Sequence, residues 1–175
     1  WSAPISNRLL TEVSVFTMPV NYTLSFQPEA AADAIATFDQ IRSHFTGVSP
    51  RQDTNKARMY TYAGFLSYVT GGHNFKVGLQ VRTGDSEELF ETRQDIVQIV
   101  NNGVPNSVRL VNNQSGHKES GVNTGFYVQD SWSFGRVTIN PGLRYERFTM
   151  SIPQQSAVAG RWVPAREFAE QRNLV

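Results

Sequence analysis

The chain has 175 residues and a formal net charge of +1, with 39% hydrophobic and 18% charged residues. This near-neutral balance gives no electrostatic reason to expect a nucleic-acid partner, and the absence of cysteine excludes disulfides, thiolate metal sites and cysteine catalysis. No run of about 18 apolar residues occurs, so the sequence predicts no transmembrane helix, whereas a strand of a membrane barrel needs only about 10 alternating residues.

The first predicted strand covers residues 7–16. One parity carries the apolar side chains Leu9, Val13 and Val15, and the other parity carries polar ones apart from Leu10, which breaks the pattern. Successive side chains of a strand point to opposite faces, so this pattern predicts one apolar and one polar face.

The next segment, residues 17–57, loses this alternation and is predicted to be a long connection. Within it, residues 28–45 predict a short helix, because Pro28 suits a first helical position and several alanines follow. A rough apolar stripe at helical spacing supports the same prediction, formed by Ile35, Phe38, Ile41 and Phe45. The helix has two open interpretations, a lid that contacts a ligand or a packed loop element.

Two further strands are predicted at residues 58–70 and 74–83, joined by a tight turn at residues 71–73. The second of them alternates most cleanly, with Phe75, Val77 and Leu79 against Lys76 and Gln80. Residues 84–121 form a second long connection, in which residues 96–111 predict a small hairpin around an Asn-Asn-Gly turn.

The last two predicted strands cover residues 122–134 and 136–148 and turn at Gly135. Both alternate between an apolar, aromatic parity and a polar one. Long and short connections then alternate along the chain, as in an up-and-down membrane barrel with short turns at one end and long loops at the other. We therefore predict an all-β antiparallel meander that is part of a transmembrane β-barrel. A soluble extracellular β-sandwich is the alternative, in which the two apolar faces would pack on each other.

Four segments together resemble the barrel of TonB-dependent outer-membrane receptors. They are GGHNFKVGLQ (71–80), NNGVPNSVRL (101–110), GFYVQDSWSFGRVTINPGLRYE (125–146) and IPQQSAVAGRWVPAREF (152–168). The third segment resembles these receptors broadly, whereas HNFKVG and VPAREF are more similar to the Oar-like branch. The resemblance implies a bacterial outer-membrane location, a 22-stranded barrel with an internal plug, lipid around it, energy from a TonB complex, and binding and import of an unknown solute.

The chain contains no recognisable plug domain or TonB box, and it begins at Trp1 rather than Met. We therefore expect it to be a piece of a longer polypeptide, with contact to the TonB complex made by parts outside it. Five membrane strands are too few to close a large barrel.

Two sets of site residues follow from the parities. The polar parity predicts lumen-facing side chains, with an internal salt-bridged network or simple solvation as the alternative: Lys76, Arg82, Gln129, Arg144 and Glu146. Aromatic residues near the short turns predict an interfacial girdle, with the core of a soluble sheet as the alternative: Tyr68, Phe75, Trp132 and Phe134. Asp130 shares the lipid-facing parity and must then lie at headgroup level.

No catalytic or cofactor chemistry is predicted. His44, His73 and His117 are scattered without the spacing of metal ligands, no nucleophile elbow frames a serine, and no phosphate-binding loop occurs. The sequence therefore predicts a binding and transport protein rather than an enzyme, without metal or cofactor.

Overall fold

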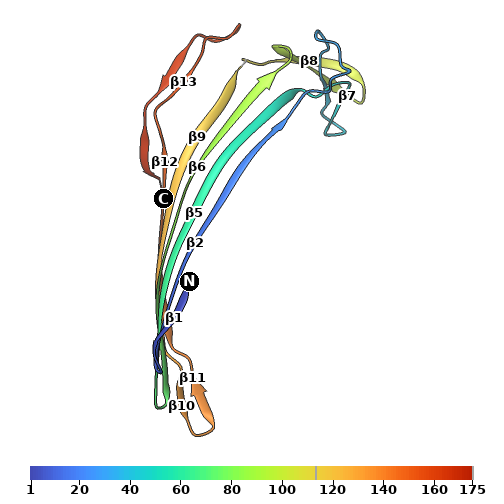
Figure 1. Ribbon diagram of the computed structural model, residues 1–175. Helices are drawn as coiled ribbons and strands as arrows, with labels where there is room; N and C mark the ends of the chain where they lie inside the picture. Colours follow the sequence, from blue (N-terminus) through green and yellow to red (C-terminus); the bar gives the residue numbers. More distant parts are fainter. Residues whose placement is uncertain (113, 175) are drawn as a thin grey trace.

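The computed structural model describes residues 1–112 and 114–174, which form strands, turns and loops without any helix. Five long strands lie side by side, antiparallel and in chain order, in one curved sheet (Figure 1). They are β2 (Leu9–Leu24), β5 (Arg51–Thr70), β6 (His73–Thr92), β9 (Ser115–Gln129) and β12 (Gly142–Ile152). The strands β1 (Ser2–Ser6) and β15 (Gln171–Leu174) flank this path. The predicted all-β antiparallel meander is confirmed.

The long strands extend beyond the predicted ranges. β5 and β6 pair without interruption from Arg51 with Thr92 to Thr70 with His73, twenty residues each. Parts of both predicted long connections are therefore strand. The apolar alternation stops before the strands do, because most side chains at their upper ends are polar and the few apolar ones, such as the consecutive Leu89 and Phe90, do not alternate. Hydrophobic periodicity therefore could not locate these ends.

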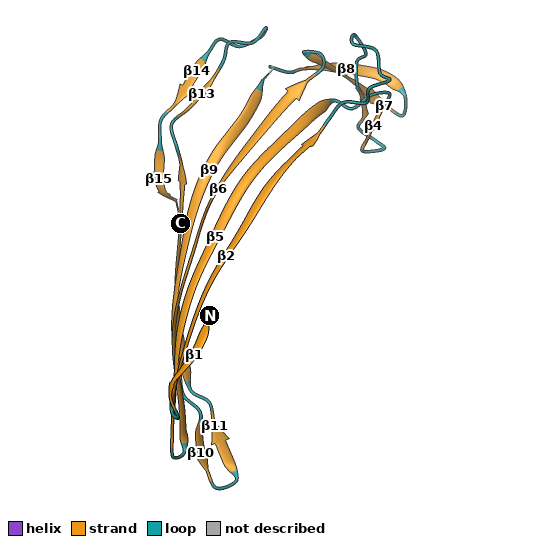
Figure 2. Cartoon of the chain, viewed as in Figure 1, coloured by secondary structure: helices purple, strands orange, loops and turns teal. Residues whose placement is uncertain are grey.

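The connections gather at opposite ends of the sheet (Figure 2). The turn between β5 and β6 lies at the lower end, as does a hairpin of β10 (Trp132–Phe134) and β11 (Val137–Ile139). β9 ends at Gln129, so this hairpin stands between β9 and β12, whereas the sequence predicted two strands that meet directly at Gly135. A hydrogen bond from the Asp130 amide to the Pro141 carbonyl, 2.9 Å, closes the base of the hairpin.

The predicted helix at residues 28–45 is wrong. The segment contains two short strands, β3 (Thr37–Asp39) and β4 (His44–Thr46), in a small sheet with β7 (Ile96–Asn101) and β8 (Val104–Leu110). Phe38 and Phe45 share one face of a helix, but they also pair directly across this hairpin, with ring centroids 4.8 Å apart. Ser43 has a φ of 53°, which turns the chain where a helix would continue.

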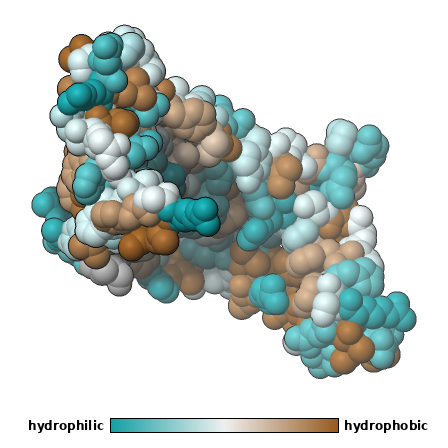
Figure 3. All heavy atoms as spheres, turned by 90° about the horizontal axis from the view of Figure 1, so that it is seen from below, coloured by the Kyte–Doolittle hydropathy of each residue, from teal (hydrophilic) through white to brown (hydrophobic). Residues whose placement is uncertain are grey.

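Hydrophobic packing is concentrated in this small sheet. Ala36, Val97 and Ile99 are buried there, with Phe38, Val48 and Val111 packed against them. In the described part of the long strands, Ala63 is the single buried hydrophobic side chain, and Leu143 is 78% exposed. Viewed from the lower end, hydrophobic residues lie open at the surface beside hydrophilic ones (Figure 3). The main sheet is therefore a single layer.

The sandwich alternative is wrong. Val77, Val128 and Leu143 follow one another in register across β6, β9 and β12, so the two faces expected to pack on each other are one face of one sheet. No helix in the described residues is long and apolar enough to cross a membrane.

The turn between β7 and β8 provides a test of the loop sheet. Asn102 and Gly103 have φ values of 49° and 80°, as a tight hairpin turn requires. Gly103→Ala should destabilise this hairpin by about 1–2 kcal/mol, because a Cβ disfavours the left-handed conformation. Hydrogen exchange of the β8 amides measures the change. Gly64→Ala, at a site open to a methyl group, should leave the β8 amides unchanged.

Candidate functional site

The register separates the long strands into two chemically different faces. Residues directly opposite each other in an antiparallel pair share a face. One face, called the apolar face below, is defined by two neighbouring rows that cross all five strands. These rows are Thr11, Leu66, Val77, Val128 and Leu143, and then Val13, Gly64, Leu79, Phe126 and Tyr145. The opposite face, called the polar face, carries Glu12, Ser14, Lys76, Gln80 and Glu146 among others.

The apolar face forms a band of limited height. Its rows run from the pair Tyr68–Phe75 at the turn end to the row of Tyr60, and they include one charged side chain, Arg147, in the row of Tyr62. In the following row Arg58 and Asp85 form an ion pair, 3.9 Å between Nε and Oδ2. The band therefore covers about nine residues of each strand, close to the 9–11 residues with which a tilted strand crosses a bilayer.

All five residues predicted to face a lumen lie on the polar face. Lys76 is opposite Gln129 and forms an ion pair with Glu12, 3.8 Å, while the Arg144 Nε lies 3.1 Å from Glu146. Arg82 is on the same face but is exposed and has no charged or hydrogen-bonded partner in the described part of the chain. Some of the charges on the polar face therefore pair with each other. The orientation of this face towards a lumen stays a prediction.

An aromatic contact on the polar face was not predicted. Phe65 breaks the apolar–polar alternation of β5. Its ring lies 5.9 Å from that of Tyr127, and the Lys76 ammonium lies 5.3 Å from the Phe65 centroid. Gly78 lies between the two rings, where a Cβ would come within 2.5 Å of both. The sequence signal that could have revealed this contact is Gly78, a glycine that stands opposite an aromatic residue on each neighbouring strand.

The four predicted girdle residues lie together near the lower end of the apolar face. Tyr68 pairs with Phe75 across β5 and β6, and Trp132 pairs with His73 across β10 and β6. The rings of Trp132 and Phe134 are edge to face at 6.4 Å. All four are between 37% and 59% exposed, so no protein layer covers them in the described residues. A membrane interface remains the predicted environment.

Asp130 fixes the chain at this cluster. Its carboxylate accepts hydrogen bonds from the backbone amide of Ser131 and from the indole of Trp132, and lies 2.8 Å from His73 Nδ1. Burial raises the pKa of Asp130, but the hydrogen bonds from His73, Trp132 and Ser131 outweigh it and hold the pKa below its usual value. Asp130 therefore stays ionised at the turn and orients the predicted girdle tryptophan.

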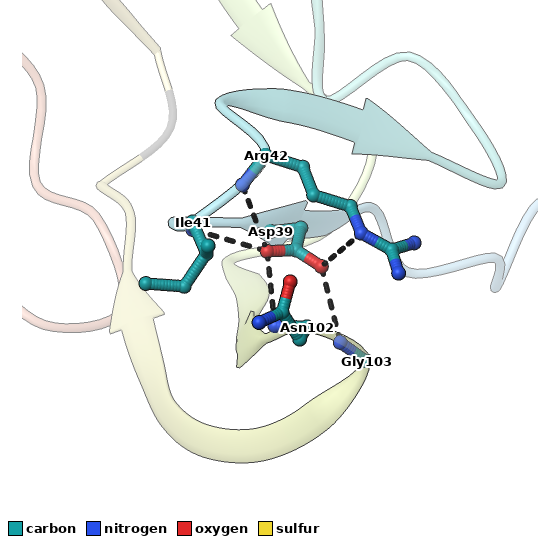
Figure 4. Close-up of polar contacts among 5 residues, drawn as sticks. All are labelled: Asp39, Ile41, Arg42, Asn102 and Gly103. Atoms are coloured by element: carbon teal, nitrogen blue, oxygen red, sulfur yellow. Dashed lines mark hydrogen bonds and ion pairs between the residues drawn. The ribbon is translucent and has the colours of Figure 1, made fainter.

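A second carboxylate, Asp39, holds the two loops together (Figure 4). Its side chain is buried and accepts hydrogen bonds from the backbone amides of Ile41, Arg42, Asn102 and Gly103 at 3.0–3.2 Å. The Arg42 guanidinium lies 3.8 Å from it. One carboxylate thus accepts hydrogen bonds from the backbone amides of the turn after β3 and of the turn after β7, which are about sixty residues apart in sequence. Sequence reasoning missed Asp39 because its partners are backbone groups.

The pKa of Asp39 is lowered despite its burial. Burial raises it, and the backbone hydrogen bonds from Arg42, Asn102, Gly103 and Ile41 together lower it further than burial raises it. A lowered folded-state pKa means that the carboxylate stabilises the loop sheet above its unfolded pKa, and that this stability is lost as the pH falls through the folded pKa.

Asp39→Asn should therefore open the loop sheet. The amide has one acceptor oxygen in place of two and places an NH₂ group against backbone donors, leaving buried amides unsatisfied. Hydrogen exchange at residues 102–103 should accelerate in the variant at neutral pH and approach the rate of the unmodified chain in strong acid. Asp33→Asn, an exposed position in the same loop, is the matched control and should exchange as the unmodified chain does. Equal rates in the two variants would contradict this role.

Comparison with known proteins adds one match. A family model described as TonB dependent receptor-like, beta-barrel, matches residues 8–166. The matched region includes all five long strands and both loop segments of the small sheet. No curated protein matches the chain.

Proposed function

The chain belongs to the TonB-dependent receptor-like β-barrel family, and from this premise we propose that it forms part of the wall of an outer-membrane barrel that binds and imports a solute. Barrels of this family are proteins of the bacterial outer membrane. In this proposal the apolar face meets lipid and the polar face lines the lumen. Passage is gated by contact with a TonB complex, and no bond of the solute is made or broken.

The observation that carries the proposal is the exposed apolar band of a one-layer sheet. Large apolar side chains such as Leu79 and Phe126 are 50% and 46% exposed, and a soluble protein would have to cover a predominantly apolar band of this size. A hydrocarbon environment covers it without further protein, and the height of about nine residues suits a bilayer.

The ends of the sheet support an orientation. Short turns and the cluster of Tyr68, Phe75, Trp132 and Phe134 lie at one end, which we assign to the periplasm. The small sheet of β3, β4, β7 and β8 lies at the other end, which we assign to the cell exterior. Loops that carry their own packed core suit solute recognition, because a rigid surface loses little entropy on binding.

Within the family we propose the Oar-like branch. The support is the similarity of HNFKVG (73–78) and VPAREF (163–168) to that branch. The first segment begins β6 next to the girdle cluster, and the second leads into β14 (Arg166–Phe168), which pairs with β13 (Gln155–Ala157) at the loop end.

Neighbouring substitutions on β6 test the membrane orientation. Leu79→Arg places a charge on the apolar face and should destabilise the folded receptor in lipid vesicles by about 2–4 kcal/mol. Gln80→Arg adds the same side chain one residue along, on the polar face, and should cost less than about 1 kcal/mol. Denaturant titration of the full-length receptor in vesicles, followed by tryptophan fluorescence, measures both.

Equal costs for the two variants, or a larger cost for Gln80→Arg, would contradict the assigned faces. A receptor that folds equally well in plain buffer and in vesicles would contradict the membrane location itself.

A further inference from the structure

The polar face contains an apolar hollow that the proposed function does not use. The chain has three methionines, and all three line this hollow. Met18 is directly opposite Met59, and the same row continues through Gly84 and Gly121 to Met150. One row across five strands therefore holds every methionine of the chain, on the face where polar residues are the rule.

The two glycines of this row, Gly84 and Gly121, leave the hollow open between the methionines. Neither Gly84 nor Gly121 has a side chain to fill the space between Met59 and Met150, and the resulting cavity has a volume of about 320 Å³. Val20, Ala57 and Phe148 extend its apolar lining. Methionine side chains are flexible and polarizable, so they adapt to apolar groups of different shape. An apolar hollow with a polar rim is typical of a ligand site.

Two charged side chains flank the hollow at opposite ends. Arg82 precedes the methionine row on β6, and Glu119 follows it on β9. Neither has an ion pair or hydrogen bond to another side chain in the described residues, unlike Arg58 and Asp85, whose side chains lie on the opposite face of the sheet and pair with each other. Glu119 is opposite Ser86, four residues beyond Arg82, which corresponds to about 13 Å along the strands.

We propose that the hollow binds a short zwitterionic peptide with apolar side chains. Its terminal carboxylate pairs with Arg82, its terminal ammonium pairs with Glu119, and its apolar side chains contact the methionines and Phe148. Four extended residues span about 13–14 Å, which matches the separation of the two charges. The inference deepens the proposed function and rests on it, because the peptide reaches this face from a water-filled lumen.

The location of the hollow fits capture from the loop end. The methionine row follows the last apolar row of the opposite face, at the level where Arg58 and Asp85 replace apolar side chains there. In the proposed orientation the hollow therefore lies near the outer membrane surface, below the loop sheet. A peptide that passes the loops would meet the hollow before the polar ion pairs deeper in the wall.

Calorimetric titration of the full-length receptor in detergent tests the inference. The probe is the tetrapeptide Ala-Leu-Leu-Ala, with a C-terminal amide form and an N-acetyl form for comparison. Either cap should weaken binding about tenfold, the effect of one lost charge-assisted contact. Arg82→Gln should weaken binding of the free peptide about tenfold and leave the affinity of the amide form unchanged. Glu119→Gln should weaken binding of the free peptide about tenfold and leave the affinity of the N-acetyl form unchanged.

Arg58→Gln is the matched control, because it removes the same charge from the opposite face and should bind the peptide as the unmodified receptor does. Equal affinity in Arg82→Gln and Arg58→Gln, equal affinity of free and capped peptides, or no binding to folded receptor would each overturn the inference. The vesicle titration of Leu79→Arg and Gln80→Arg is independent of any ligand, so the proposed function could stand when the peptide site fails.

Discussion

The continuous backbone ladder of the long strands is the constraint on which the remaining structure depends. A sheet of one layer buries almost no side chains, so its shape is held by paired amides and carbonyls. The uninterrupted pairing of β5 with β6 fixes which residue stands opposite which over their whole length. A shift of one residue would move every apolar side chain to the other face. The chemistry of both faces therefore follows from the register.

The carboxylates of Asp130 and Asp39 accept hydrogen bonds from backbone amides where the strand pairing ends. At each end of the sheet, turns leave backbone groups without ladder partners, and a short acidic side chain accepts hydrogen bonds from them. At the lower end Asp130 also orients Trp132. At the upper end Asp39 joins two loops into one body with its own core. Hydrogen bonds to charged acceptors thus provide at the ends the order that strand pairing provides in the middle.

Sequence patterns predicted those parts of the fold in which side-chain chemistry repeats. The alternation around Phe75 and Lys76 predicted that the two residues lie on opposite faces of one strand, as the register has them, because a strand repeats with a period of two. The upper ends of β5 and β6 were not predicted as strand because their side chains are mostly polar and show no apolar alternation. The predicted helix failed at Phe38 and Phe45, whose spacing suits a helical face and a hairpin pair equally, so only the tertiary pairing of β3 with β7 decides. Asp39 left no signal because its partners are main-chain amides.

The parallel pairing of β3 with β7 has a consequence for the way the loops could change. β3 lies in the connection between β2 and β5, and β7 lies in the connection between β6 and β9. A new loop sequence inserted at one of these connections would lose half of a shared core and half of the partners of Asp39. The two connections therefore form a single exchangeable unit, although the chain encodes them separately. Replacement of this end of the sheet therefore requires both connections at once, and a graft of both loops with the strands between them is the smallest transferable cassette.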